Sequence, residues 1–364
     1  MKLNKEYKLK NILSKKVIVS SNSGNYNIYI GNGILEKAHV ILSNALNQRQ
    51  VILIFDNNIS DKVNSLKKSL EKSTPRISIV PIHPGETSKS LKSFSLILEK
   101  ILSIGIDRNT LVIAFGGGVV GDIAGFVSSV LLRGIDFIQI PTTLLAQVDS
   151  SVGGKTGINS QYGKNLIGTF HQPIAVLSDL ETLNTLDKRQ IKAGYAEIIK
   201  YGLIFDPIFF QWLEKNGLNV INGNLEKRSY AIIQSCKIKS TIVKNDEFEK
   251  GQRSLLNLGH TFAHSFESMS GYQNSILHGE AVSVGIILAF KLAVKMNICK
   301  KVDLDRVTQH FIRLNLPSSI KQFKNKNYTI KEIWETMQRD KKSSNGNVNF
   351  VLPKTIGKAV LIKN

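Results

Sequence analysis

Four short stretches in the first part of the chain are almost entirely apolar, and turn-forming or polar residues follow them. They are Gln50–Phe55, Ile77–Ile82, Thr110–Phe115 and Phe137–Ile140. Strands that are apolar on both faces are typical of parallel sheets covered by helices. A helical period over Ser90–Ile104 fits this alternation of strands and helices. We therefore predict an α/β domain whose strand carboxyl ends share one edge, where such sheets bind ligands.

The pattern changes after about residue 180, where strand signals nearly vanish. Helical periods cover Leu186–Tyr201, Leu225–Val243, Leu255–Met269, Gly279–Met296 and Asp303–Leu314. Further strands are predicted at Val17–Ser20, Tyr26–Ile30, Val348–Leu352 and Ala359–Ile362. The expected organisation is a basic extension over residues 1–15, an α/β domain over 16–180 and a mainly α-helical domain over 181–364. A cleft between two such domains is the default position for an active site.

The chain is strongly basic, with 48 lysines and arginines against 28 acidic residues and a formal net charge of +20. Such an excess raises the question of nucleic-acid binding. The motif-rich segment Leu111–Asn165, however, carries three charged residues of each sign, so the excess lies outside it. No recognition motif with interleaved aromatic residues accompanies the lysines. We expect solvated surface lysines and no nucleic-acid partner, although a positive field suits an anionic substrate.

Cysteine content and hydropathy bear on the compartment. Cys236 and Cys299 are the two cysteines, too few for a disulfide framework or a cysteine-based zinc site. No apolar run approaches the roughly 18 to 20 residues that span a bilayer. The N-terminal lysines precede no apolar stretch of the kind found in secretory signals. We expect a cytoplasmic protein with no membrane partner.

Leu111–Asp122 combines a strand, three glycines and the start of a helix. Glycines let a backbone approach a ligand closely, and a helix N-terminus offers free N–H groups to a phosphate. The spacing is neither GxGxxG nor a P-loop, and a tight turn with close helix packing is the alternative interpretation. Two preceding strands also end in polar residues that suit ribose hydroxyls or, alternatively, form ordinary turns and caps. These polar residues are Asp56, Asn58, Glu86 and Lys89.

Small and polar residues follow the fourth buried strand, from Pro141 to Gly157. Lys155 lies in a glycine turn there, and Lys164 and Asn165 come shortly afterwards. Lys155 is a candidate contact for an anion, and a solvated lysine on a flexible loop is the alternative.

The helical half contains a set of residues suited to a metal. His260 and His264 are four residues apart and share a helix face, His278 opens the next helix, and Glu197 and Lys200 lie one turn apart on a third. One carboxylate and two imidazoles are a sound ligand set for a catalytic zinc with open positions. The pattern is not HExxH, and two histidines on one helix face can also be structural.

Together these residues resemble the 3-dehydroquinate synthase family of sugar phosphate cyclases. The resemblance covers the chain from about Val17 to its end and rests on five separated blocks: Gly116–Asp122, Leu132–Gly157, Ala196–Gly202, Asn257–His264 and His278–Glu280. Pro84 departs from the family, where aspartate often precedes Gly-Glu, and this puts one nucleotide contact in question.

The resemblance implies a Rossmann-like NAD-binding domain, a helical metal-binding domain and an active site in the cleft between them. The implied activity converts 3-deoxy-D-arabino-heptulosonate 7-phosphate to 3-dehydroquinate and phosphate, as a lyase of the shikimate pathway that leads to aromatic amino acids. The implied steps are transient oxidation by NAD, phosphate β-elimination, reduction, ring opening and intramolecular aldol closure. Arg133 resembles a residue that reaches the neighbouring subunit's site, which implies a homodimer.

The family's site residues map onto this sequence position by position. The implied ligands of a divalent metal, zinc with cobalt as the alternative, are Glu197, His260 and His278. The implied NAD contacts are Asp56, Asn58, Glu86, Lys89, Gly118, Val119, Val120, Gly121, Asp122, Thr142, Thr143, Lys155, Lys164, Thr182, Leu183, Asn184 and Thr185. The implied catalytic residues are Asp149, Lys155, Lys200, Lys239, Arg253, Asn257 and His264, and the implied substrate contacts are Arg133, Lys164, Asn165 and Lys341, with Lys342 as the alternative to Lys341.

Three other functions compete with this one. A metal-dependent polyol dehydrogenase that releases NADH shares the fold, but it gives no reason for the anion-binding set Lys155, Lys239 and Arg253. Other sugar phosphate cyclases act on sedoheptulose 7-phosphate or glucose 6-phosphate, which lack a carboxylate for Arg253 and Lys239. A basic nucleic-acid-binding protein rests on charge alone.

Overall fold

The computed structural model describes residues 15–271, 275–323, 328–340 and 348–363. Lys341, Lys342 and nearly all of the predicted N-terminal extension lie outside the described residues. The chain divides into two compact units. The N-terminal unit runs to Leu186 and includes Lys239–Glu247, and the C-terminal unit contains Asp187–Ile238 and the chain from Phe248 onward.

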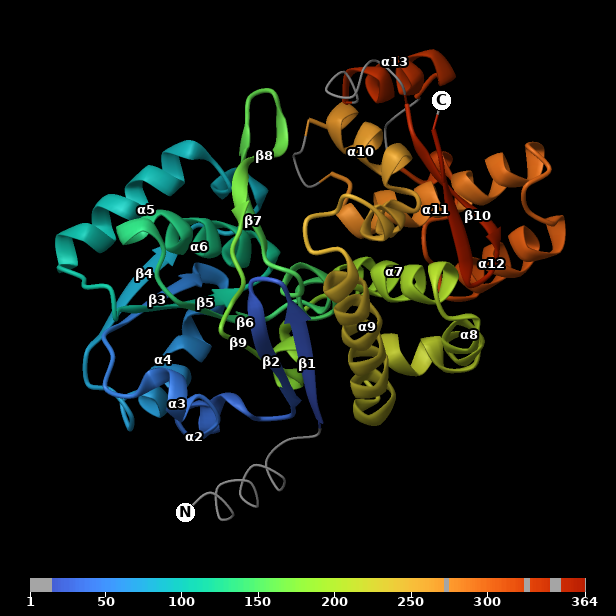
Figure 1. The fold of residues 1–364 in the computed structure, drawn as a ribbon. Coiled ribbons are helices and arrows are strands. Elements are labelled where there is room, and N and C mark those ends of the chain that lie inside the picture. The colour runs from blue at the N-terminus through green and yellow to red at the C-terminus, as the bar shows by residue number, and fades with distance from the viewer. Residues whose placement is uncertain (1–14, 272–274, 324–327, 341–347, 364) are drawn as a thin grey trace. The chain divides into compact units, whose positions relative to one another are not determined.

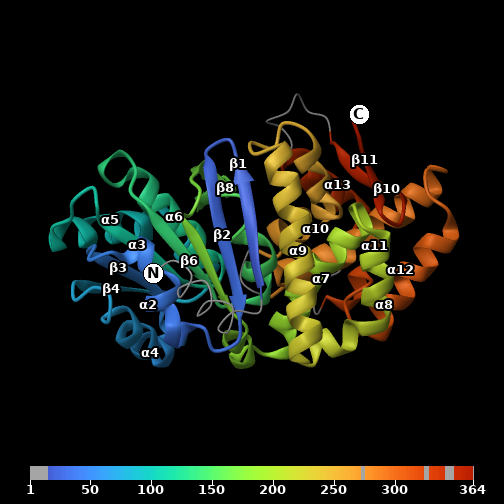
Figure 2. The same ribbon diagram turned by 60° about the horizontal axis from the view of Figure 1, so that its bottom comes forward.

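The N-terminal unit is built on a seven-stranded sheet with the order β1-β2-β9-β6-β5-β3-β4 (Figures 1 and 2). All neighbours pair in parallel except β1 and β2, so the predicted parallel sheet is confirmed, with one antiparallel edge strand. A separate hairpin pairs two further strands. The sheet strands are β1 Lys15–Ser21, β2 Gly24–Gly31, β3 Val51–Asp56, β4 Ile77–Ile82, β5 Leu111–Gly116, β6 Phe137–Pro141 and β9 Ala175–Asp179, and the hairpin strands are β7 Lys155–Ser160 and β8 Gly163–Phe170.

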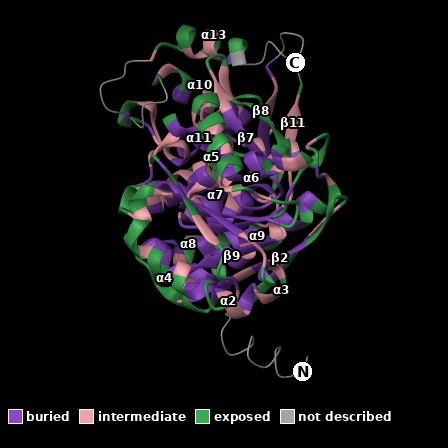
Figure 3. Ribbon diagram, turned by 90° about the vertical axis from the view of Figure 1, so that its left-hand side faces the viewer, coloured by how far each residue is buried: buried purple, intermediate pink, exposed green. Residues whose placement is uncertain are grey.

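Helices cover both faces of this sheet (Figure 1). Alternate strand residues point to opposite faces: Leu53 packs with α2, α3 and α4, whereas Ile54 packs with α5 and α6. The strands β3, β5, β6 and β9 are therefore almost wholly buried (Figure 3), as continuous apolar runs predict, whereas β1, β2 and β4 are buried only in part. The helical segments of this unit are η1 Leu35–Lys37, α2 Ala38–Ile41, α3 Ser43–Leu46, η2 Asn57–Ile59, α4 Ser60–Leu70, η3 Glu86–Ser88, α5 Leu91–Ile104, α6 Gly118–Val130, η4 Leu131–Arg133, the π-helix η5 Ala146–Ser150 and η6 Leu180–Thr185.

The C-terminal unit is mainly helical, as predicted. Helix α11 is largely buried and packs against α7, α10 and α12 and the strand β10. The elements are α7 Lys188–Ile204, α8 Pro207–Ile221, α9 Leu225–Asn245, η7 Gln252–Asn257, α10 His260–Met269, α11 His278–Lys295, α12 Lys301–Arg313, η8 Ile320–Gln322, α13 Ile330–Asp340, β10 Phe350–Thr355 and β11 Lys358–Ile362. The last residues of α9, from Lys239, pack with the N-terminal unit.

One predicted helix is wrong at its start. Leu255–Met269 was expected to be continuous, but η7 ends at Asn257 and α10 begins at His260. Gly259 between them has a φ of 81°, a left-handed conformation that no helix interior adopts. The break makes His260 the first residue of α10.

Candidate active site

The sheet order of the N-terminal unit identifies one edge for ligand binding. From β3 the chain passes to β4 on one side and then returns to place β5 on the other side of β3. Ligands of open α/β sheets bind at such a switch point, beyond the strand carboxyl ends. Asp56 ends β3, and Gly116 ends β5. The polar strand ends and the glycine turn therefore meet at this switch point.

The glycine turn leads directly into α6, whose N-cap residue is Gly117. Among the described residues, no side chain caps this helix, and the first N–H groups of a helix are donors of the kind that bind phosphate. Close packing explains part of the turn, because a Cβ on Gly116 would lie 2.5 Å from Val120. A Cβ on Gly118 would lie 3.1 Å from the Ser150 hydroxyl, a contact that a small shift relieves. Close packing thus explains Gly116, and nucleotide binding at Gly118 stays a prediction.

The polar residues at this edge are already joined by hydrogen bonds. Asp56 accepts from the backbone N–H of Asn58 at 2.8 Å and so caps η2, as its alternative interpretation predicts. Lys89 is buried and its ammonium contacts both Asp122 and Asn165. Burial raises the pKa of Asp122, and the Lys89 charge opposes this rise.

The predicted contacts after β6 and β9 are organised by a buried glutamine. Gln147 donates to the carbonyls of Pro141 and Asp179, at 3.2 and 2.9 Å, and lies 3.3 Å from the Thr182 hydroxyl. Thr142 is also buried, and its N–H donates to the Gly116 carbonyl at 2.9 Å. These bonds fix the ends of three strands at the same edge. The remaining predicted residues here are Thr143, which accepts from the Ala146 N–H, and Leu183, Asn184 and Thr185 of η6.

The π-helix η5 carries Asp149, which binds Lys239 from α9. The Lys239 ammonium lies 2.6 Å from a carboxylate oxygen of Asp149 and 2.7 Å from its carbonyl. π-Helical turns occur frequently at functional sites. Lys239 is buried, so this pair is more than a surface contact. Lys155 and Lys164 lie on the β7–β8 hairpin, and Arg133 is exposed on a turn with a φ of 70°.

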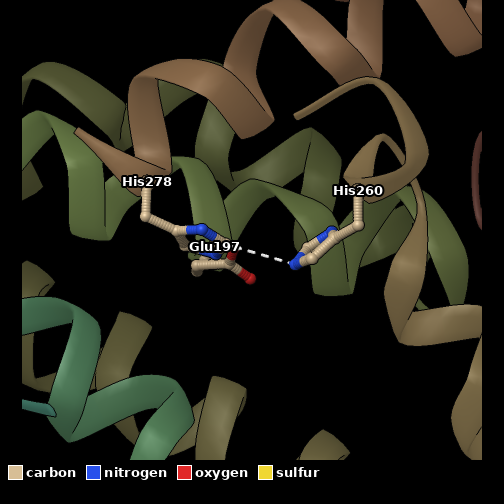
Figure 4. Close-up of side chains that lie close together, drawn as sticks. All are labelled: Glu197, His260 and His278. Atoms are coloured by element: carbon tan, nitrogen blue, oxygen red, sulfur yellow. Dashed lines mark ion pairs between the residues drawn. The ribbon is translucent and has the colours of Figure 1, made fainter. Parts of the chain in front are cut away.

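In the C-terminal unit, Glu197, His260 and His278 converge from α7, α10 and α11 (Figure 4). Their ligand atoms all lie within 4.8 Å of one another. The Nε2 atoms of His260 and His278 lie 3.8 and 3.5 Å from the same Glu197 oxygen. Glu197 is fully buried, and one carboxylate with two imidazoles is a donor set that zinc prefers. The residues present therefore fit a divalent metal.

Glycines allow the three helices to come close enough. A Cβ on Gly279 would lie 2.0 Å from the Ala193 carbonyl of α7, and one on Gly285 would lie 2.2 Å from the Gly259 carbonyl. Neither position tolerates a side chain without movement of the backbone. Both histidines are the first residues of their helices, so these contacts place the imidazoles directly over Glu197.

Each histidine is held at its second nitrogen. His260 Nδ1 lies 3.3 Å from the Leu258 carbonyl, and His278 Nδ1 lies 3.3 Å from the buried Glu267 carboxylate. Burial and the Lys200 charge hold the pKa of His260 well below its usual value. Burial also lowers the pKa of His278, but the charges of Glu267 and Glu197 outweigh it and raise this pKa to about 10. Metal binding to His278 therefore requires the loss of a proton.

Of the other predicted residues of this unit, Lys200 and His264 lie beside the cluster. The buried Lys200 forms an ion pair with Glu197, and the His264 ring lies 5.6 Å from that of His260 without joining the ligand set. Asn257 donates to Glu249 at 2.9 Å. Arg253 is 1% exposed, so its guanidinium does not lie on the surface.

Three residues that hold others in place were not predicted from the sequence: Glu267, Gln147 and Asn159. Glu267 had a signal, since it lies three residues after His264 and seven after His260, on the same face of the helical period. Gln147 and Asn159 gave none, because their contacts join segments far apart in the chain.

The fold as a whole is that of sugar phosphate cyclases. A crystal structure of 2-deoxy-scyllo-inosose synthase complexed with carbaglucose-6-phosphate, NAD+ and Co2+ has a TM-score of 0.85 and 28% identity, with 96% of each chain covered. ValA, the 2-epi-5-epi-valiolone synthase of Streptomyces hygroscopicus with NAD+ and Zn2+ bound, has a TM-score of 0.84 and 28% identity, covering 93% of this chain and 92% of that one. Glycerol dehydrogenase from Schizosaccharomyces pombe shares the fold at 16% identity, with a TM-score of 0.67 over 95% of this chain and 89% of its own.

Sequence comparison narrows this class to one family. Residues 79–193 match the model of the 3-dehydroquinate synthase N-terminal region, and residues 194–343 match that of its C-terminal region. The 3-dehydroquinate synthase of Zymomonas mobilis is 44% identical over 96% of this chain and 93% of its own length, and that of Rhodospirillum rubrum is 42% identical over 96% and 91%. The chain belongs to the 3-dehydroquinate synthase family. Within the described residues, no helix combines the length and apolar character that crossing a membrane requires.

Proposed function

We propose that this chain converts 3-deoxy-D-arabino-heptulosonate 7-phosphate to 3-dehydroquinate and phosphate, a carbon–oxygen lyase reaction of the shikimate pathway. The observation that carries the proposal is the Glu197–His260–His278 cluster in a chain of this family. The predicted anion-binding residues add support, because the substrate carries both a carboxylate and a phosphate.

The proposed cofactors are NAD and a divalent metal, zinc with cobalt as the alternative. The two cyclase structures bind NAD+ together with Co2+ or Zn2+, which supports both. When bound, the metal supplies a Lewis acid for the substrate hydroxyls, and NAD supplies a hydride acceptor that is restored within the cycle. The switch-point edge with the α6 N-terminus suits the pyrophosphate of NAD.

The charged residues are proposed to hold the two anionic ends of the substrate. Lys155, Lys164 and Asn165, on or beside the β7–β8 hairpin, suit the phosphate, which is the leaving group. Arg253 suits the carboxylate because a guanidinium presents two parallel donors and stays charged when buried. Lys239 is proposed to act with it while Asp149 fixes the position of its ammonium.

Further features of the proposal concern assembly, compartment and the remaining residues of the site. We propose a homodimer in which the exposed Arg133 serves the site of the second copy. A cytoplasmic location and an active site between the two domains stay predictions. Asn257, His264 and Lys200 stay the proposed polar catalytic residues beside the metal.

Substrate choice tests the proposal. Steady-state kinetics should compare the heptulosonate phosphate with sedoheptulose 7-phosphate and glucose 6-phosphate, with the products identified by NMR. The proposal predicts that 3-dehydroquinate forms from the first sugar and that kcat/KM for the other two is lower by at least about 100-fold, because Arg253 would be left without its carboxylate. Efficient cyclisation of either alternative sugar would contradict it.

A further inference from the structure

Asn159 lies at an irregular point of the β7–β8 hairpin. The two strands pair regularly from Lys155 to Ile158, and the register then shifts between Ile158 and Ser160. Between these pairs Asn159 faces three residues of β8, 164–166, so the extra residues of this bulge lie on β8 and include Asn165. Bulges are common beside active sites, where they aim a side chain that a regular strand would point elsewhere.

Both polar atoms of the Asn159 side-chain amide form hydrogen bonds. Its Nδ2 donates to a Glu86 carboxylate oxygen at 2.7 Å, and its Oδ1 accepts from the Asn165 N–H at 3.0 Å. The Asn159 N–H also donates to the Lys89 carbonyl at 2.8 Å. Asn159 therefore connects the predicted NAD contacts Glu86 and Lys89, in η3 and at its C-cap, to the strand with the predicted substrate contact Asn165.

The hairpin needs such an attachment. Its outer strand is largely exposed, and a two-stranded hairpin is marginally stable alone. Asn165 adopts a φ of 56°, in the left-handed region that is uncommon for residues with a side chain, although asparagine adopts it more readily than most. Its backbone N–H is held by Asn159 and its side chain by Lys89. These contacts from the η3 turn and the bulge keep Asn165 in this conformation.

We propose that Asn159 is a positioning residue that couples nucleotide binding to the order of the substrate-binding hairpin. Asparagine suits this role because its amide donates to a carboxylate with one atom and accepts from an N–H with the other. An aspartate would face the Glu86 carboxylate with a like charge, and an alanine would break both bonds. Coupling between two sites is reciprocal, so ordering the hairpin favours nucleotide binding, and the bound nucleotide favours the ordered hairpin.

The test measures amide hydrogen exchange of the hairpin in the ligand-free protein, and NAD affinity by calorimetry. In Asn159→Ala, peptides covering residues 160–170 should exchange at least about 5-fold faster, NAD affinity should fall about 3- to 10-fold, and KM for the sugar phosphate should rise about 10-fold with kcat within about 3-fold. Gln161→Ala, an exposed substitution at the tip of the same hairpin, is the matched control and should change none of these.

A rescue experiment distinguishes positioning from general damage. Asn159→Asp should lose hairpin protection, and combining it with Glu86→Gln should restore much of that protection, because the amide and the carboxylate have exchanged places. Unchanged exchange in a folded Asn159→Ala protein would overturn the proposal, as would faster exchange with unchanged NAD affinity. The coupling to substrate rests on the proposed function, but the exchange result does not: failure of the wild type to form 3-dehydroquinate would overturn the function alone.

Discussion

The carboxylate of Glu267 lies 3.3 Å from Nδ1 of His278, while Nε2 of the same ring lies 3.5 Å from Glu197. A carboxylate at Nδ1 fixes the tautomer and the ring orientation of a metal-binding histidine. Glu267 is 3% exposed, so water competes little for this contact. Glu267 therefore fixes the orientation of His278, one of the three proposed metal ligands.

Removing that support should weaken metal binding. We predict that Glu267→Ala lowers the affinity for Zn2+ by about 10- to 100-fold, measured by competition with a chromophoric chelator. Glu267→Gln, whose amide oxygen still accepts from Nδ1, should lose less. His260→Ala removes a ligand and should abolish stoichiometric metal and activity. Glu247→Gln changes a buried glutamate of the other unit and serves as the control. Unaltered affinity in Glu267→Ala would refute the support role.

Substitutions at two positions of the glycine turn should distinguish its role in packing from its role in nucleotide binding. Gly116→Ala places a methyl group 2.5 Å from Val120 and should lower the free energy of unfolding by about 1 to 3 kcal/mol. Gly118→Val has more room but puts a branched side chain at the start of α6, so NAD affinity should fall by at least about 10-fold while the fold survives. Denaturant melts and calorimetry check the two effects. Full NAD affinity in a folded Gly118→Val protein would contradict the site.

We predict that Arg253 contributes to binding of the substrate and little to binding of NAD or the metal. In Arg253→Ala we expect a loss of about 2 to 4 kcal/mol of transition-state binding, or about 30- to 1000-fold in kcat/KM, because a buried charged pair with the carboxylate is lost. Metal content and NAD affinity should stay nearly unchanged. Steady-state kinetics with metal analysis measures this, and a loss under about threefold would reopen the choice of substrate.

His310 should make stability depend on pH. It is 3% exposed, its Nε2 lies 3.3 Å from the Tyr195 hydroxyl, and burial lowers its pKa to about 4. Between pH 7 and 4 His310 takes up a proton in the unfolded chain but stays neutral in the native state. The free energy of unfolding therefore falls as the pH falls, by about 3 kcal/mol from this residue. Urea melts of the wild type and His310→Gln should show a shallower pH dependence in the variant. Parallel pH profiles would contradict this.

Much of the sheet was predictable because its strands carry their own signal. Runs such as Ile77–Ile82 are mostly apolar, and the bounds of β4 match this one residue for residue. The strands β7, β8 and β9 were missed. Both hairpin strands contain glycine and β8 is largely exposed, so no apolar pattern marks them, and β9 is only five residues long. α8 was missed although Asp206 and Pro207 form a typical helix start. α4 and α13 were missed as well.

The metal site, like the sheet, could be predicted only in part. Glu197, His260 and His278 follow from residue type and from the family resemblance, and the structure brings them together. What brings them together is close helix contact at Gly259, Gly279 and Gly285, which is a tertiary property that spacing along the chain does not encode. The same holds for Asn159, whose partner Glu86 lies 73 residues away.

The central claim is that NAD is used and restored within each turnover. The direct measurement incubates the metal-loaded protein with the heptulosonate phosphate and with NAD far below the substrate concentration, following phosphate release, 3-dehydroquinate and absorbance of NADH together. The account predicts equal amounts of phosphate and 3-dehydroquinate, many of each per NAD, and no lasting NADH signal. NADH that accumulates in step with substrate consumption, without phosphate release, would contradict it and indicate a dehydrogenase.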